Sequence, residues 1–354
     1  MRQRGDRLAA DGGPEAGGPP PRYARRAQLR AAVFAPRDRP PGEQQRAAAG
    51  SVAAGIIAQL RPDVIVLDTA RGTESFAVSP ATVTWLGEHT PPSALRPGDQ
   101  AVIRHRGTDG GAPGGRLAER IWVRIGRVTG TIVAADGREF LVDTAGRDGP
   151  PRRVVLAAAA QRRIQVRFPR LAPGYLLDVI GTRESGLLVA VAPATAQPPY
   201  RAGHQPASPL VSTPVPASVS GSAVWHEPDG EPPGLLGLGY PALDPETGGR
   251  QTRQEAGCVR LPYLSLGSAV RISNECAGRS AVLPVTSDGA VARQFCDRCL
   301  ECGTSPRGRV ADLTMTAFAE LGGNLEEGCF NATMTPDLTP GAAVTAPDRN
   351  GGFL

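Results

Sequence analysis

An internal repeat constrains the fold of this chain more than any other sequence feature. Three short motifs recur in the same order. They are Gly-Ile-Ile-Ala returning as Gly-Thr-Ile-Val (55–58 and 130–133), Val-Leu-Asp-Thr-Ala returning as Leu-Val-Asp-Thr-Ala (66–70 and 141–145) and Leu-Arg-Pro-Gly returning as Leu-Ala-Pro-Gly (95–98 and 171–174). The first two recur after 75 positions and the third after 76. Matches in nearly one register indicate two copies of one module.

Each copy is predicted to be built from β-strands. An apolar run at 64–67 precedes a turn, and residues 164–168 alternate apolar and polar side chains as a half-buried strand does. The Leu-x-Pro-Gly motif is expected at a tight turn before a further strand. Several short strands with glycine-marked bends favour a small Greek-key barrel. The pattern resembles bacterial OB-fold-like envelope modules, which implies two scaffold barrels, at 51–125 and 126–192, without an active site of their own.

Three other segments have compositions typical of chain that forms no hydrophobic core. Residues 1–50 are rich in Arg, Gly, Pro, Ala and Gln without a hydrophobic period, residues 193–217 form a Pro/Ser/Thr linker, and residues 335–354 form a polar tail. We expect disorder at both ends and a semi-extended linker between the modules and the last domain.

Charge and residue usage exclude some functions. Residues 101–170 hold 14 arginines against six acids, but no recognition motif accompanies them, and we expect no nucleic-acid partner. The chain contains no lysine, which excludes Schiff-base chemistry, a phosphate-loop lysine and a Ser–Lys dyad.

The sequence gives mixed information on the cellular compartment. No run approaches the 18 or so apolar residues of a membrane span. The basic segment 1–7 is not followed by the apolar stretch of a signal peptide. We nevertheless expect an extracytoplasmic protein, because of its cysteine usage; the export signal would then lie upstream of the assigned start or elsewhere. The alternative is a protein that stays inside the cell.

All six cysteines fall within one window of 72 residues. They are Cys258, Cys276, Cys296, Cys299, Cys302 and Cys329. An even number in a small, loop-rich domain predicts three disulfides, whose pairing the sequence leaves open. The alternative is a metal or iron–sulfur site on the Cys-x-x-Cys-x-x-Cys run at 296–302, but only one histidine, His226, follows the linker. We therefore expect disulfides, with no metal and no cofactor.

The last domain, at 218–334, is also predicted to be mainly β. Apolar runs predict strands at 221–225, 269–273 and 281–285. A short helix is predicted after Asp312, with Thr314 as its N-cap and Gly322 and Gly323 at its end.

Four motifs of this domain stand in a recognisable order. They are Leu-Ser-Leu-Gly-Ser with the strand that follows (264–272), Gly-Arg-Ser with its strand (278–285), Asp-Gly (288–289) and Arg-Val-Ala-Asp-Leu-Thr before the helix (309–314). This order resembles the double-psi β-barrel of the rare lipoprotein A and expansin group. The predicted fold class is therefore mainly β, with two OB-like barrels followed by a disulfide-stapled double-psi barrel that carries one short helix.

The resemblance implies carbohydrate or cell-wall chemistry. In lytic members an acidic residue protonates the glycosidic oxygen, and Asp288 stands at that position; Asp312 corresponds to the second acid of the group. The turn at 286–291 lacks the Arg and Pro of the usual motif. Asp288 as a turn residue and Asp312 as a structural partner at the helix start are the alternatives.

Few aromatic side chains are available to stack on sugar rings. The candidates are Trp225, Tyr240 and Tyr263, with Phe295 as a further one, and packing in the core or in loops is the alternative for each. We therefore expect a cell-wall-associated binding or structural protein that contacts a polysaccharide or an envelope protein. Its oligomeric state stays open. A lytic transglycosylase that uses Asp288 is the second hypothesis, and an intracellular metal- or redox-linked protein is the third.

Overall fold

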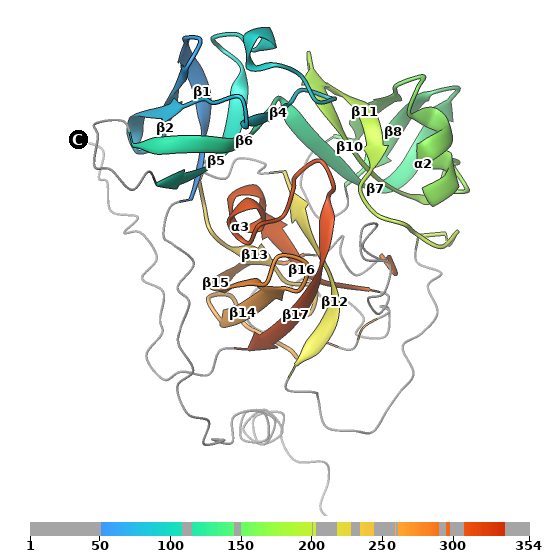
Figure 1. Cartoon of the computed structure of the whole chain (residues 1–354). Coiled ribbons are helices and arrows are strands. Elements are labelled where there is room, and N and C mark those ends of the chain that lie inside the picture. The colour runs from blue at the N-terminus through green and yellow to red at the C-terminus, as the bar shows by residue number, and fades with distance from the viewer. Residues whose placement is uncertain are drawn as a thin grey trace, which may run out of the picture. The chain divides into compact units, whose positions relative to one another are not determined.

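The computed structural model describes residues 51–107, 115–144, 150–199, 201–202, 218–227, 234–243, 259, 261–289, 295–297 and 308–336 (Figure 1). The segment 1–50, most of the linker and of the last tail, and the cysteines Cys258, Cys299 and Cys302 lie outside these residues. Within the described part the chain is mainly β, as predicted, and its strands form three closed barrels.

The first barrel contains the strands of the first repeat copy. They are β1 (Val52–Leu60), β2 (Val64–Thr69), β3 (Gly72–Ala77), β5 (Gln100–Gly107) and β6 (Arg116–Val123), with β4 (Val83–Trp85) added beside β6 and a 3-10 turn, η1, at Pro92–Ala94. The strand order is β3-β2-β1-β5-β6, and a parallel pairing of β3 with β6 closes the ring.

The second barrel contains the second copy. Its elements are β7 (Ile125–Asp136), β8 (Glu139–Asp143), β9 (Arg152–Leu156), α2 (Gln161–Arg167), β10 (Leu176–Glu184) and β11 (Leu187–Pro193). The order around the ring is β9-β8-β7-β10-β11, and β9 and β11 close it in parallel. The two copies therefore share one Greek-key topology, which confirms the duplication.

The equivalence extends to single contacts. Strand pairing shifts register at Ile57 in the first barrel and at Ile132 in the second, 75 positions apart. A Cβ on Gly55 would lie 2.2 Å from the carbonyl oxygen of Asp68, and a Cβ on Gly130 would lie 2.1 Å from that of Asp143. Both glycines stand where the neighbouring backbone leaves no room for a side chain.

The strand predicted at 164–168 is wrong, since these residues lie in and directly after helix α2. Ile164 and Phe168 are buried in the core of the second barrel, whereas Val166 is 67% exposed. Side chains four positions apart share one face of a helix. The alternation over five residues therefore came from a single buried helical stripe and not from a strand.

The third barrel is six-stranded. It comprises β12 (Val219–His226), β13 (Leu238–Gly239), β14 (Ala269–Asn274), β15 (Arg279–Ser287), β16 (Arg309–Thr314) and β17 (Cys329–Pro336), with helix α3 (Met315–Glu320) after β16. The order is β12-β16-β13-β15-β14-β17, and two of its pairs, β12–β16 and β13–β15, are parallel. The strands predicted at 221–225, 269–273 and 281–285 lie within β12, β14 and β15.

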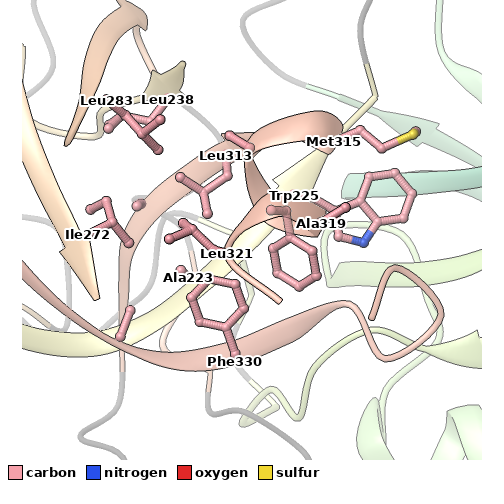
Figure 2. Packing of buried hydrophobic residues seen from close by; sticks show 14 of the residues in the cluster. Ala223, Trp225, Leu238, Ile272, Leu283, Leu313, Met315, Ala319, Leu321 and Phe330 are labelled. Carbon is pink, nitrogen blue, oxygen red and sulfur yellow. The ribbon is translucent and has the colours of Figure 1, made fainter. Parts of the chain in front are cut away.

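The predicted helix is confirmed as α3. The Thr314 side chain accepts a hydrogen bond from the backbone N–H of Ala317 and so caps its N-terminus. Figure 2 shows how the buried side chains of the helix, among them Ala319, pack toward Leu313 and Phe330 from the strands. The rings of Phe318 and Phe330 stack with their centroids 4.7 Å apart.

The disulfide prediction is met only in part. Cys276 and Cys296 each take part in a disulfide, but not with each other. No bridge joins two cysteines that the structure describes, so the three-disulfide arrangement stays a prediction. Cys329 is buried on β17 beside Val224. No helix in the described part of the chain is long and apolar enough to cross a membrane.

Candidate functional site

One row of residues across the third barrel brings together the acids that the sequence singled out. Strand pairing places Asp312 of β16 opposite Gly239 of β13, and Gly239 opposite Ser287, the last residue of β15. Asp288 follows directly. Adjacent strands lie about 4.8 Å apart, so the backbones of Asp312 and Ser287 are roughly 10 Å apart.

The glycine at position 239 allows the end of β15 to lie close against β13. A Cβ on Gly239 would lie 3.1 Å from the Ser287 hydroxyl oxygen and 3.2 Å from the Cα of Gly289. The backbone N–H of Tyr240 donates to the carbonyl of Ser287 at 2.9 Å, which fixes the end of β15 against β13. Between Asp312 and the Ser287–Asp288 corner, β13 therefore contributes backbone and no side chain.

His226 is a member of the site that sequence reasoning missed. Its Nδ1 lies 3.4 Å from Oδ1 of Asp312, and the two side chains are 8% and 13% exposed. Leu313 and Trp225, the chain neighbours of this pair, belong to the barrel core. Because side chains alternate along a strand, His226 and Asp312 point away from that core. Asp288 is only partly buried.

The expected sugar-stacking aromatics are placed differently from one another. Trp225 and Tyr240 are fully buried; the Trp225 indole donates to the carbonyl of Leu325 at 2.9 Å, and the Tyr240 hydroxyl donates to that of Pro262 at 2.7 Å. Phe295 is also buried, in the core of the second barrel. The stacking role expected of these rings is therefore replaced by core packing. Tyr263, by contrast, is 42% exposed.

A buried ionic network joins the third barrel to the second. Asp178 of β10 is fully buried and receives two hydrogen bonds from Arg127 of β7, from Nε at 2.8 Å and from Nη2 at 2.7 Å. Arg309 of β16 donates to the same carboxylate and, through Nε at 2.8 Å, to that of Asp297. Ser222 of β12 donates to Asp297 at 3.1 Å.

These contacts favour the charged forms of Asp178 and Arg309. Burial alone would raise the pKa of Asp178, but the charges of Arg127 and Arg309 and the hydrogen bonds outweigh it and lower that pKa to about 2. Burial alone would lower the pKa of Arg309, yet the charges of Asp297 and Asp178 raise it above its ordinary value. A buried ion network of this kind is stable only while each charge keeps its partners.

Next to the candidate pair, Glu227 makes a second connection to the second barrel. Its carboxylate accepts from the backbone N–H of Arg127 at 2.9 Å and from Nε of Arg183 at 2.7 Å. Burial raises the pKa of Glu227, and the charge of Arg183 offsets part of that rise. The strand end that carries His226 is thereby fixed to the second barrel.

The segment 323–328, between α3 and β17, contacts all three barrels. Arg104 of the first barrel donates to Asn324 Oδ1 at 3.1 Å, and Trp122 donates its indole N–H to Glu326. Nη1 of Arg127, in the second barrel, donates to the carbonyl of Gly328 at 2.6 Å. A Cβ on Gly328 would lie 2.7 Å from Ile180 Cδ1, so the close contact requires glycine.

Neither His226 nor the ionic network carried a local sequence signal. A lone histidine at a strand end and single charged residues inside apolar strands are common. The pairing of β12 with β16, in which Asp312 lies opposite Val224, two residues before His226, is what brings His226 and Asp312 together.

Among the described residues no cluster of three or more histidine, cysteine or acidic side chains is arranged to hold a metal ion. Comparison with models of known protein families and with curated proteins gave no match.

Proposed function

We propose that this chain is an extracytoplasmic, cell-wall-associated binding protein. Its third barrel is of the double-psi kind found in the rare lipoprotein A and expansin group, and it binds a wall glycan at the Asp288–Asp312 end without cleaving it. The first two barrels serve as its scaffold.

Three observations support the parts of this proposal. A closed six-stranded barrel with two parallel pairs agrees with a double-psi topology. Disulfide bonding of Cys276 and Cys296 agrees with an oxidising compartment outside the cytoplasm. The buried ion network between the barrels agrees with a rigid scaffold.

Two features of the site residues favour binding over cleavage: the pairing of Asp312 and the burial of the aromatic rings. Asp312 is paired with His226. The two rings expected to stack on a sugar chain, Trp225 and Tyr240, are buried in the core. Cleavage requires a substrate held in register with the acid. Binding requires only hydrogen-bonding groups at the surface, which the partly buried Asp288 and its turn supply.

One observation favours the second candidate, a lytic transglycosylase. Asp288 and Asp312 lie at the same end of the barrel, separated by the single strand β13. In lytic cleavage a hydroxyl of the sugar itself attacks, so one carboxylic acid would suffice where ordinary glycosidases use a pair.

Purified cell-wall sacculi separate the two functions. The full chain should sediment with sacculi and release no muropeptides. Asp288→Asn should bind about tenfold more weakly, because a hydrogen bond to a charged group is lost. Asp63→Asn, on an exposed turn of the first barrel, is the matched control and should bind as wild type. Muropeptide release that Asp288→Asn abolishes would establish the lytic function instead. Neither binding nor release would remove both.

A further inference from the structure

The second barrel carries an uncompensated basic segment that the proposed function does not use. Residues 157–170 contain four arginines and no acid. All four are exposed on or just after α2: Arg162, Arg163, Arg167 and Arg170. The opposite side of the helix packs into the barrel through Ile164 and Phe168. Figure 1 shows α2 beside the strands of the second barrel.

Among the residues that the structure describes, none of these four guanidinium groups forms an ion pair. The ion pairs of the described second-barrel residues involve other arginines: Arg127, Arg153 and Arg183 of that barrel, and Arg309 of the third. Arg163 donates to the carbonyl of Val191, which leaves its charge unneutralised. The segment therefore presents a net charge of +4 toward solvent.

The basic segment also exposes one apolar side chain, that of Val166. Val166 is 67% exposed, more than Leu266 or Ile56, which are each 45% exposed. On the helix it lies one turn after Arg162 and Arg163. An exposed aliphatic group next to arginines is an unfavourable surface in water and a favourable one at a lipid headgroup layer.

The first barrel shows that the fold does not require these arginines. Its corresponding stretch, 78–94, connects the same two strands through β4 and η1 and contains one acid, Glu88, and no arginine. Both copies form a closed ring of strands, one with each kind of connection. The basic segment is therefore a property of the second copy alone.

We infer that the α2 face of the second barrel, residues 157–170, binds an anionic phospholipid surface. Guanidinium groups bind phosphate through paired hydrogen bonds. Each arginine near an anionic membrane strengthens binding about fivefold. A single-stranded nucleic acid would need exposed aromatic rings for stacking, and the one ring of this segment, Phe168, is buried. This inference does not depend on the proposed function of the third barrel.

The full chain is tested by sedimentation with vesicles. It should bind vesicles of phosphatidylcholine with about 30% phosphatidylglycerol at low salt, lose most binding at about 0.5 M salt, and leave pure phosphatidylcholine vesicles unbound. The triple variant Arg162→Gln, Arg167→Gln and Arg170→Gln should bind about a hundredfold more weakly. Val166→Ser should weaken binding severalfold.

The matched control removes the same charge elsewhere. Arg61, Arg71 and Arg106 are exposed arginines of the first barrel, and changing all three to Gln should leave vesicle binding within about twofold. Equal losses in both triple variants, or equal binding to neutral vesicles, would overturn the inference. So would tight binding of a single-stranded oligonucleotide, lost in the α2 triple variant, without vesicle binding. Unchanged thermal unfolding of both triple variants checks that they fold.

Discussion

The first and second barrels share a backbone frame but place different side chains against the third barrel at two pairs of equivalent positions. Under the repeat, the register pair Ala54–Val102 of the first barrel corresponds to Thr129–Asp178 of the second. Val102 belongs to an apolar core shared with the third barrel. Asp178 sits in the buried ion network.

The neighbouring positions repeat this contrast. Val52 of the first barrel lies in the same shared core, and its counterpart 75 positions later is Arg127. At these two positions the same topology thus carries hydrophobic contacts in the first copy and ionic contacts in the second. Elsewhere each barrel uses both kinds, since Ile180 of the second barrel joins the apolar core and Arg120 of the first pairs with Glu326. A hydrophobic contact weakens gradually when a side chain is shortened, whereas an ionic one fails when a single partner is lost.

The largest expected effect tests this difference directly. Asp178→Ala leaves Arg127 and Arg309 buried without their shared carboxylate and should lower the free energy of unfolding by about 3–5 kcal/mol. Val102→Ala removes two methyl groups and should cost about 2 kcal/mol. Urea denaturation of both variants measures the contrast. Equal losses would mean that the two interfaces respond alike.

A second comparison tests whether the frame is the same in both copies. Gly55→Ala and Gly130→Ala each force a Cβ against a backbone carbonyl, at 2.2 and 2.1 Å, and should each cost about 2–3 kcal/mol. Gly107→Ala is the control, because no atom lies within 4 Å of its added Cβ. Thermal unfolding should show the two barrel variants shifted by similar amounts. A large effect in only one copy would contradict an equivalent frame.

Acid should weaken the ionic contact selectively. The pKa of Asp178 is lowered from 3.8 to about 2 on folding, so the stability that it contributes is complete above pH 4 to 5. That contribution falls by about 2 kcal/mol as the pH drops from 4 to 2. The raised pKa of Glu227 acts with the opposite sign, since its protonated form favours the folded state.

Denaturation of wild type and of Asp178→Asn across this pH range isolates the Asp178 contribution. The difference between the two proteins should shrink as the pH falls. A difference that stays constant would show that Asp178 is not the titrating group.

Features written in local sequence were predictable. The motif repeat identified two barrels because each motif marks a bend, and the Thr314 cap identified α3. The alternation at 164–168 was too short to distinguish a strand from a helix, since Ile164 and Phe168 suit either. Resemblance pointed to Asp288 and Asp312, which the structure brings to one end of a barrel.

The rest depended on contacts between distant parts of the chain. His226 and Asp312 are 86 positions apart, and Asp178 and Arg309 are 131 apart. No periodicity or spacing connects such residues. Their pairing follows only from which strands lie side by side in the closed barrels.

The contacts of segment 323–328 also impose an order of assembly during synthesis. The ribosome delivers the first and second barrels more than 100 residues before this segment emerges. Until then the Trp122 indole and the Arg127 guanidinium lack Glu326 and the Gly328 carbonyl. The nascent barrels therefore carry an exposed seam that only a late part of the chain can cover. Aggregation during synthesis, and the benefit of a chaperone, should be greatest in that interval.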